Sequence, residues 1–452
     1  MKPADEVTIL GGGPAGLATA FYAHRSGLSF ALFERSSELG GLCRTFRLGE
    51  HRYDSGAHRF HDRDAEVTRD ARELLGDALV SVKAPSQILH RGRFIDFPPG
   101  PLTWLRGEGV LAAARSAAEI LSGRLRPRPE RSFEDVAVNR YGRRLAQPLL
   151  IEYSEKLWGL PVSELAPDAA TQRLSGLAMK ALLVELFLPG RRSAHLDGAF
   201  LYPRPGYGAI CDGLAAALPR ERVHLEHEVE SVHVEAGCVR LVAFKGRAPL
   251  AVEGRVVSTL PLSGIARLLG ASLPEAAHRA AERLRFRHIR LVFLRLGVPR
   301  CTANATIYIP APDLMVSRVF EPKNRSIDLA PRHETALVAE VPCSTGDPIW
   351  LMDDAALAAR VVAELSGTGL MTAAMVLDQK VHLLANAYPV YALDSADARN
   401  EVSAALASIT NLDLLGRGGR FWYSHLHDQM RSAKDYVGSF RKTRANPARS
   451  MS

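Results

Sequence analysis

The chain has 452 residues, a formal net charge of +8 at neutral pH, and 47% hydrophobic and 23% charged residues. This length exceeds what one hydrophobic core usually holds, so we expect two or three domains in an ordinary globular composition. The sequence contains no apolar run long enough for a membrane-spanning helix. The positive charge favours an anionic small-molecule substrate over a nucleic acid, because no basic run with interleaved aromatic residues is present.

The cysteines and the N-terminal sequence indicate in which cellular compartment the protein is located. The first expected strand begins at Val7, which leaves no room for a signal peptide. The cysteines are scattered without a CxxC pair, which is typical of reduced thiols and does not predict a metal site. They are Cys43, Cys211, Cys238, Cys301 and Cys343. We therefore expect a cytoplasmic protein.

Residues 7–34 predict a strand, a tight glycine turn, a helix and a second strand. The turn reads Gly11-Gly12-Gly13-Pro14-Ala15-Gly16, which matches the GxGxxG pattern of dinucleotide-binding Rossmann units. The helix that follows would direct its positive N-terminal end at a pyrophosphate. Glu34, with Arg35 beside it, ends the second strand where a carboxylate accepts hydrogen bonds from a ribose. A carboxylate there argues against a 2′-phosphate and hence against NADP.

A second glycine-rich element follows directly and reads Gly40-Gly41-Leu42-Cys43-Arg44. A Gly-Gly pair followed by an arginine, just after the ribose acid, resembles the FAD-binding extension of glutathione-reductase-like flavoproteins. The two elements together predict FAD as the cofactor. A plain NAD-binding Rossmann domain with a glycine-rich loop is the alternative.

The middle of the chain alternates between strand-like and helix-like patterns. A loop with two histidines and an arginine, His58-Arg59-Phe60-His61, precedes a predicted hairpin over residues 87–97. Residues 104–124 and 133–160 have helical periodicity. The apolar segment 179–188 is predicted as a buried or lid helix, and a helix lying on a membrane is the alternative.

The order of strands predicts an α/β fold with a discontinuous FAD-binding domain, an inserted helical domain and a second, antiparallel sheet. The FAD-binding domain is expected over residues 1–100, 200–265 and 375–440, and the helical substrate or lid domain over residues 101–199. The antiparallel substrate-binding domain is expected over residues 266–374. The polar, basic tail over residues 441–452 is expected to be disordered.

Beyond the two glycine elements, four further motifs are spread along the chain. They are Tyr53-Asp-Ser-Gly-Ala-His58, Tyr153-Ser-Glu-Lys-Leu-Trp158-Gly159, Glu321-Pro-Lys-Asn-Arg-Ser326 and Gly416-Arg417. Taken together, these motifs resemble FAD enzymes related to UDP-galactopyranose mutase, within a clan that includes protoporphyrinogen oxidase and the amine oxidases. The resemblance runs almost end to end.

The resemblance implies roles for individual residues. His58 would lie beside the flavin ring, Arg417 with Gly416 at the flavin edge, and Val229 against the adenine. Tyr153 and Trp158 would contact the substrate, Tyr153 by stacking on a nucleotide base, and Arg287 would lie near the substrate or flavin. Before the last helix the family has Arg-Tyr and then Met-Asp, whereas this chain has Trp422-Tyr423 and Leu426-His427. We expect Tyr423 at the substrate and the Leu426-His427 pair at the flavin.

Two chemistries remain open. In the first, FAD takes a hydride from a substrate carbon, with His58 or His427 as the base. In the second, reduced FAD catalyses a redox-neutral isomerisation of a nucleotide sugar, with Arg287 and Arg173 binding its diphosphate. Because the sequence contains no second GxGxxG motif, the flavin would exchange electrons with oxygen, a partner or an external reductant. We predict the hydride-transferring oxidoreductase.

Overall fold

The computed structural model describes residues 6–90, 92–97, 110–174 and 199–445. The expected lid helix at 179–188 lies outside these ranges, and so does the tail from residue 446. The expected disorder from residue 441 is wrong at its start, because the last helix, α16 (Leu426–Ala445), extends through residues 441–445. In the described part of the chain, no helix is long and apolar enough to cross a membrane.

The N-terminal unit is built on a parallel sheet of five strands. Its order is β19 (Leu412–Leu414), β13 (Arg255–Ser258), β1 (Val7–Leu10), β2 (Phe30–Phe33) and β9 (Val223–His224). The central strands β1 and β2 are buried along their whole length, because both faces of the sheet are covered. Ile9 and Leu32 face the core shared with helices α1 (Pro14–Arg25), α9 (Ala209–Ala216) and α16. Leu10 and Phe33 face the opposite core.

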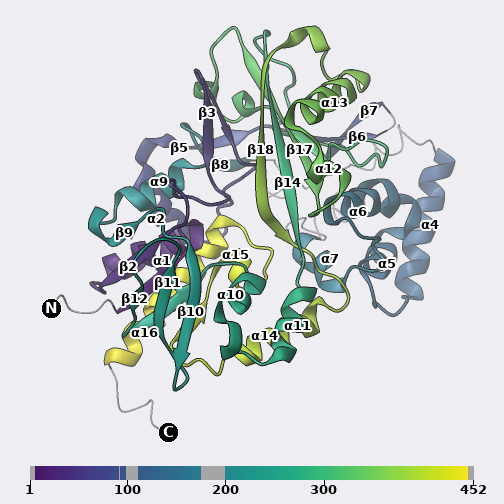
Figure 1. The fold of residues 1–452 in the computed structure, drawn as a ribbon. Coiled ribbons are helices and arrows are strands. Elements are labelled where there is room, and N and C mark those ends of the chain that lie inside the picture. Colours follow the sequence, from purple (N-terminus) through teal and green to yellow (C-terminus); the bar gives the residue numbers. More distant parts are fainter. Residues whose placement is uncertain (1–5, 91, 98–109, 175–198, 446–452) are drawn as a thin grey trace.

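That opposite core lies under a small antiparallel sheet and a group of helices (Figure 1). The sheet has the order β10 (Val229–Glu235), β11 (Cys238–Phe244) and β12 (Leu250–Ala251). The helices are α10 (Leu262–Leu269), α11 (Glu275–Arg283) and α14 (Ser395–Leu406). The parallel sheet is therefore closed on both faces, and only its carboxyl edge is left for a ligand.

A larger second sheet rises beside this unit, with its long strands in the upper half of Figure 1. Its order is β18 (Val376–Pro389), β14 (Phe286–Leu296), β17 (Thr335–Cys343), β16 (Arg318–Phe320), β15 (Thr306–Tyr308), β6 (Ser86–His90) and β7 (Arg93–Phe97). All neighbours are antiparallel except β15 and β6, which are parallel. Helices α12 (Pro348–Leu351) and α13 (Asp354–Gly367) follow β17, and α13 packs on the face of the sheet that carries Val292. The other face carries Leu291 and Phe293.

This sheet corrects two of the expected boundaries. The hairpin β6–β7 and the strand β18 were assigned to the FAD-binding unit, within residues 1–100 and 375–440, but both pair with the second sheet. Their partners lie far away in the sequence, so neither pairing leaves a local signal. The sheet is also mixed rather than purely antiparallel, because β6 runs parallel to β15.

The described part of residues 101–199 is helical up to Leu174. It contains α4 (Val110–Leu125), α5 (Phe133–Ala146), a π-helical segment (Gln147–Ile151), α6 (Glu152–Trp158) and α7 (Pro167–Leu174). Ser132 begins α5 with a capping box, since its hydroxyl accepts from the Asp135 N–H while the Asp135 carboxylate accepts from the Ser132 N–H. The π-helical segment lies directly before α6, which carries Tyr153.

The remaining elements connect these layers. Two antiparallel pairs join β3 (Thr45–Leu48) with β4 (His51–Asp54) as a hairpin, and β5 (Leu79–Lys83) with the distant β8 (Ala199–Pro203). Helix α2 (Ala65–Leu75) precedes β5, and the short α15 (Gly416–Gly419) precedes α16. Short 3-10 turns are centred near residues 77, 221, 271, 323, 328 and 374.

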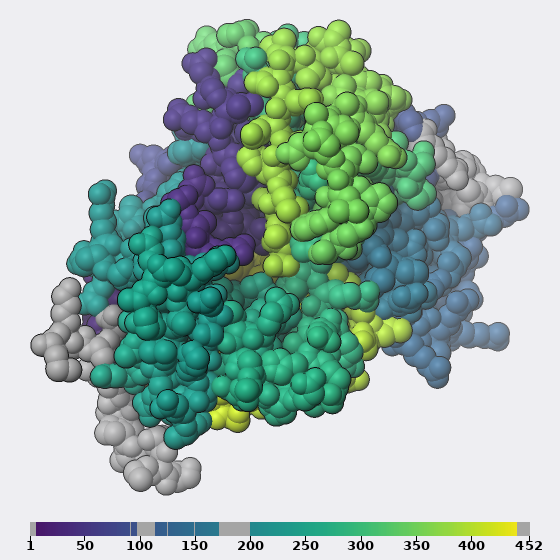
Figure 2. Space-filling model, viewed as in Figure 1, coloured from purple at the N-terminus to yellow at the C-terminus, as the bar shows by residue number. Residues whose placement is uncertain are grey.

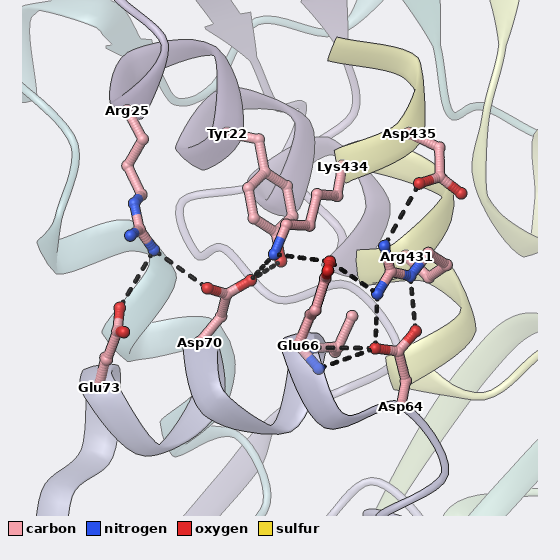
Figure 3. A network of polar contacts seen from close by, with 10 residues as sticks. Tyr22, Arg25, Asp64, Glu66, Asp70, Glu73, Arg431, Lys434 and Asp435 are labelled. Atoms are coloured by element: carbon pink, nitrogen blue, oxygen red, sulfur yellow. Dashed lines mark hydrogen bonds and ion pairs between the residues drawn. The ribbon is translucent and has the colours of Figure 1, made fainter. Parts of the chain in front are cut away.

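A polar cluster fixes the C-terminal helix to the N-terminal unit (Figure 3). Arg431 on α16 binds Asp64 through two hydrogen bonds of 2.5 and 2.6 Å, and Asp64 is also the N-cap of α2. Lys434 donates to Asp70 at 3.0 Å, and the Tyr22 hydroxyl of α1 donates to the same carboxylate at 2.7 Å. The cluster therefore holds α1, α2 and α16 together behind the parallel sheet.

Candidate active site

The turn after β1 packs so closely against its neighbours that a side chain at Gly11 or Gly16 would clash. Gly11 has a φ of +104°, and a Cβ there would lie 2.4 Å from Thr259 Oγ1. A Cβ on Gly16 would lie 1.9 Å from the Gly11 carbonyl oxygen. Helix α1 begins at this turn, and no side chain caps its N-terminus. An uncapped helix end beside a cavity fits the pyrophosphate of a dinucleotide.

Glu34 lies beside this turn and stabilises it. Its Oε2 accepts the Gly12 N–H at 2.7 Å, and its Oε1 accepts the Ser36 N–H at 3.0 Å and the Ser36 hydroxyl at 2.8 Å. A carboxylate has about four lone-pair sites, so it can still accept hydrogen bonds from a ribose. Glu34 lines the cavity described next, as does the exposed Arg35.

A cavity of about 1660 Å³ extends from the glycine turn to the second sheet. In Figure 2 the surface is hollowed where the purple N-terminal part, the teal strands and the yellow-green strand β18 meet. Most of the residues selected from the sequence line this cavity. They are Gly11, Gly13, Pro14, Ala15, Glu34, Arg35, Gly41, Leu42, His58, Tyr153, Val229, Gly416, Arg417, Tyr423 and Leu426.

Arg287 is placed away from the cavity, contrary to its expected catalytic and diphosphate-binding roles. It is buried and donates to the carbonyl oxygens of Leu157 at 3.0 Å and Lys156 at 3.3 Å. It also donates to the Ser344 hydroxyl at 2.5 Å. The carbonyls at the C-terminal end of a helix have no intrahelical partner, and Arg287 satisfies them for α6. Arg287 is therefore a positioning residue behind Tyr153.

Trp158 is also in the core rather than at the substrate. Its side chain is 2% exposed and meets Phe133 edge-on, with 6.2 Å between the ring centroids. Tyr153, one turn earlier on α6, does line the cavity and meets Tyr308 edge-on at 5.4 Å. The two aromatic residues of one motif thus lie on different faces of the same helix.

Of four more selected residues, three lie outside the cavity lining, and the side chain of the fourth is not described by the structure. The Arg44 guanidinium pairs with Glu38 at 3.0 Å, outside the cavity lining. Gly16 lies within α1, where it supports the turn without lining the cavity. His427 lies behind His425, its ring stacked at 5.6 Å, and His425 takes the cavity wall. Arg173 is in α7, and its side chain lies outside the part of the structure that is described.

Burial lowers the pKa of three histidines at the cavity, His58, His61 and His425, and so disfavours their charged form. Burial, reinforced by the nearby Arg417, lowers the pKa of His58 to about 3. Burial likewise lowers the pKa of His61 and of His425 to about 3. His58 stacks on Tyr207 with 4.8 Å between the rings, and its Nε2 lies 3.3 Å from the Ser55 hydroxyl. A base with so low a pKa accepts protons weakly at neutral pH, which argues against the expected role of His58 as a general base.

A pair of tyrosines forms one wall of the cavity. Tyr388 and Tyr423 stack with 5.7 Å between ring centroids and an angle of 26°. The Arg417 guanidinium lies 5.7 Å from the first ring and 5.5 Å from the second, within the range of cation–π contacts. Arg417 donates to the backbone oxygens of Ala387 and Ser424. Tyr388 was not selected from the sequence, although it lies at the end of the long strand β18, directly before Pro389.

Cations outnumber carboxylates around the cavity by two to one among the described residues. The carboxylates are Glu34, Asp62, Asp96 and Glu228. The cations are Arg35, Arg59, Arg63, Arg72, Lys83, Arg267, Arg318 and Arg417. Such a lining attracts anions. No group of three or more His, Cys, Asp or Glu side chains is placed to hold a metal ion within the described ranges.

The family model for flavin-containing amine oxidoreductases matches residues 14–396 of the chain. The chain belongs to this family. It is an FAD-dependent enzyme, and the residues around the glycine turn fit that cofactor. Gly11, Gly13 and Glu34 would hold the adenosine diphosphate part, and Gly41, Gly416 and Arg417 line the same cavity.

Curated relatives and solved structures agree with this membership. The chain is 26% identical to coproporphyrinogen III oxidase of Mycobacterium tuberculosis over 428 residues, which is 88% of this chain and 90% of that protein. Its fold is similar to reduced UDP-galactopyranose mutase, with a TM-score of 0.82, 17% identity and coverage of 97% and 96% of the two chains. A putative protoporphyrinogen oxidase from Exiguobacterium has a TM-score of 0.77 at 22% identity, with coverage of 96% and 98%. The predicted resemblance to the mutase and oxidase clan is thus confirmed.

Proposed function

We propose that this flavoenzyme is an oxidoreductase that removes a hydride from an anionic small molecule. The observation that carries the proposal is the cation-rich cavity, in which burial lowers the pKa values of His58 and His425 and disfavours their charged form. Positive charge at the site favours an anionic substrate and also favours the electron-rich reduced state of a flavin. When bound, FAD supplies a hydride acceptor in its oxidised state and a nucleophile in its reduced state.

This chain's own residues would then bind and orient the substrate rather than exchange protons with it. The Tyr388–Tyr423 pair offers flat apolar surface, and Tyr153 with Tyr308, which belong to the same core cluster, offers more in the cavity lining. Arg318, which donates to the Tyr388 hydroxyl at 2.9 Å, fixes that ring. The sequence relative that oxidises coproporphyrinogen III, a molecule with several carboxylates, supports an anionic substrate and makes that compound the first to screen.

Electrons would leave the flavin to oxygen or to an external acceptor, because the described chain has no second dinucleotide cradle. We place the reaction in the cytoplasm. Free cysteines support this placement, since Cys43, Cys211, Cys238, Cys301 and Cys343 are all unpaired.

A second candidate function is the redox-neutral isomerisation of a nucleotide sugar by reduced enzyme. The stacked tyrosines with the Arg417 guanidinium over both rings and the shared fold with UDP-galactopyranose mutase favour it. One experiment separates the two candidates. Oxidised enzyme is mixed anaerobically with candidate anionic substrates, and dithionite-reduced enzyme is incubated with UDP-galactopyranose. Bleaching of the oxidised flavin supports the oxidoreductase, whereas isomerisation that requires prior reduction supports the isomerase.

A further inference from the structure

Arg59 is a cation in the cavity wall that has no counter-charge. Its Nη2 donates to the Ser86 hydroxyl at 2.5 Å and lies 3.4 Å from the Thr306 hydroxyl. Its guanidinium carbon lies 4.9 Å from the centroid of the Phe200 ring. Among the described residues, no carboxylate lies within ion-pair distance of it. All of these contacts are neutral, so the positive charge is held in place but not balanced.

The two hydroxyls that contact the Arg59 guanidinium come from two neighbouring strands of the second sheet. Ser86 on β6 and Thr306 on β15 are direct partners in the parallel register. Both are buried, with 7% and 1% of their surfaces exposed. Their hydroxyls therefore lie side by side behind the guanidinium, while Arg59, Ser86 and Phe200 all line the cavity.

The nearby carboxylates are already engaged by other groups. Glu340 is paired with Arg318 at 2.6 Å and accepts the Ala57 N–H at 2.9 Å. Asp54 accepts the Tyr202 hydroxyl at 2.5 Å and the Tyr207 N–H at 2.8 Å. Neither is available to neutralise Arg59.

A second buried cation near Arg59 adds to the positive charge that is not balanced by a carboxylate. Arg325 donates to the same Thr306 hydroxyl at 3.2 Å and to the Ala305 carbonyl oxygen at 3.0 Å; it forms no ion pair with the described residues, although Asp54 is close enough to oppose the lowering of its pKa. Burial lowers the pKa of Arg59 and, with the neighbouring positive charge, that of Arg325. A buried charge without a partner destabilises the fold, so its presence calls for an anion that the protein itself does not contain.

We propose that Arg59 binds an anionic oxygen group of the substrate, a carboxylate or a phosphate, in the part of the cavity bordered by Ser86 and Phe200. This rests on the proposed function, because it assigns the anion to the substrate. The contacts of Arg59 come from β6, β8 and β15 and none comes from the glycine turn, so we assign the anion to the substrate rather than to the diphosphate of FAD. A guanidinium fork matches the oxygen geometry of both groups.

The test measures equilibrium binding of three probes to the FAD-loaded enzyme by thermal shift and by perturbation of the flavin spectrum. Benzoate carries a carboxylate, phenyl phosphate carries a phosphate, and benzamide has the same ring without charge. Benzoate or phenyl phosphate should bind and benzamide should not, and whichever anion binds more tightly identifies the group. Arg59→Gln should weaken that binding by about 10- to 100-fold, the loss of a charged hydrogen bond.

Arg72→Gln is the matched control, because Arg72 lines the same cavity but is exposed. It should change binding by less than about 3-fold, as expected for a screened surface charge. If R59Q does not fold, Arg59→Lys serves instead, since a lysine keeps the charge but lacks the fork and should also bind more weakly. Equal binding of benzamide, no binding of either anion, or equal losses in R59Q and R72Q would overturn the proposal.

The unfolding temperature of R59Q gives a second readout, which separates anion binding by Arg59 from a purely structural role of this residue. Without anion, R59Q should unfold at the same or a higher temperature than the unmodified enzyme, because a buried unpaired charge has been removed. An anion should raise the unfolding temperature of the unmodified enzyme and leave that of R59Q unchanged. These measurements involve no turnover. If no substrate bleaches the flavin while binding still depends on Arg59, the oxidoreductase assignment fails and the anion site stands.

Discussion

Glu34 offers the sharpest test of how this chain holds its cofactor. The change Glu34→Gln keeps the size and shape of the side chain but removes the charge and leaves only one accepting oxygen. In the enzyme, one oxygen accepts from Gly12 at 2.7 Å and the other from Ser36 at 2.8 and 3.0 Å. The amide must turn an N–H₂ group towards one of these donors, so either the turn or the ribose contact is lost.

The expected loss is that of one hydrogen bond to a charged group, about 1.5–3 kcal/mol. This corresponds to an FAD dissociation constant raised about 10- to 150-fold. The assay titrates apoprotein with FAD and follows the quenching of flavin fluorescence. Glu38→Gln is the matched control, because Glu38 is an exposed neighbour that pairs with Arg44 outside the cavity. Unchanged affinity in E34Q, or an equal loss in E38Q, would refute the assignment of Glu34 to the cofactor.

Three further outcomes follow from the contacts of individual residues. Arg287→Gln should lower the unfolding free energy by about 2–3 kcal/mol in denaturant titrations while FAD affinity stays within error, because it leaves the carbonyls at the end of α6 unpaired; weaker FAD binding without loss of stability would contradict this. Arg431→Gln should lower the free energy of unfolding by about 1 kcal/mol at neutral pH. Because the Arg431 hydrogen bond lowers the Asp64 pKa from 3.8 to about 2, that contribution is present above pH 3.8 and lost as the pH falls through 2, so the two proteins should differ in stability at pH 5 and converge in strong acid. Since burial lowers the His58 pKa to about 3, the bleaching rate should show no His58-dependent step between pH 5 and 8, and His58→Gln should slow it less than about 10-fold; a step near pH 6.5 that disappears in H58Q would restore the histidine as a base.

The features that were read correctly from the sequence are local ones. The glycine turn, the helix behind it and Glu34 lie within one short βαβ unit, so their spacing alone determines how they meet. The FAD requirement followed from this unit and from Gly40-Gly41, whereas the family resemblance also depended on motifs along the rest of the chain. By contrast, the hairpin β6–β7 was assigned to the wrong unit because its partner strand β15 lies more than two hundred residues away.

The errors at the site have the same origin. Arg287 was selected from the family resemblance, but whether its guanidinium faces the cavity or the end of α6 depends on the packing of β14 against that helix. Trp158 and Tyr153 belong to one motif, yet the helix turns one inward to Phe133 and the other to the cavity. The need for an anion at Arg59 became visible only when the register of β6 and β15 showed that its partners are neutral hydroxyls.

The central claim is that oxidised enzyme takes electrons directly from an anionic substrate. The most direct measurement is a single anaerobic turnover in a stopped-flow spectrometer, with oxidised enzyme mixed against coproporphyrinogen III and other reduced anionic compounds. We expect the visible flavin band to bleach at a rate that saturates with substrate concentration, to recover when oxygen is admitted, and to bleach more slowly at low substrate concentration in R59Q. If no compound bleaches the flavin, and only dithionite-reduced enzyme converts UDP-galactopyranose, the enzyme is an isomerase and the claim is wrong.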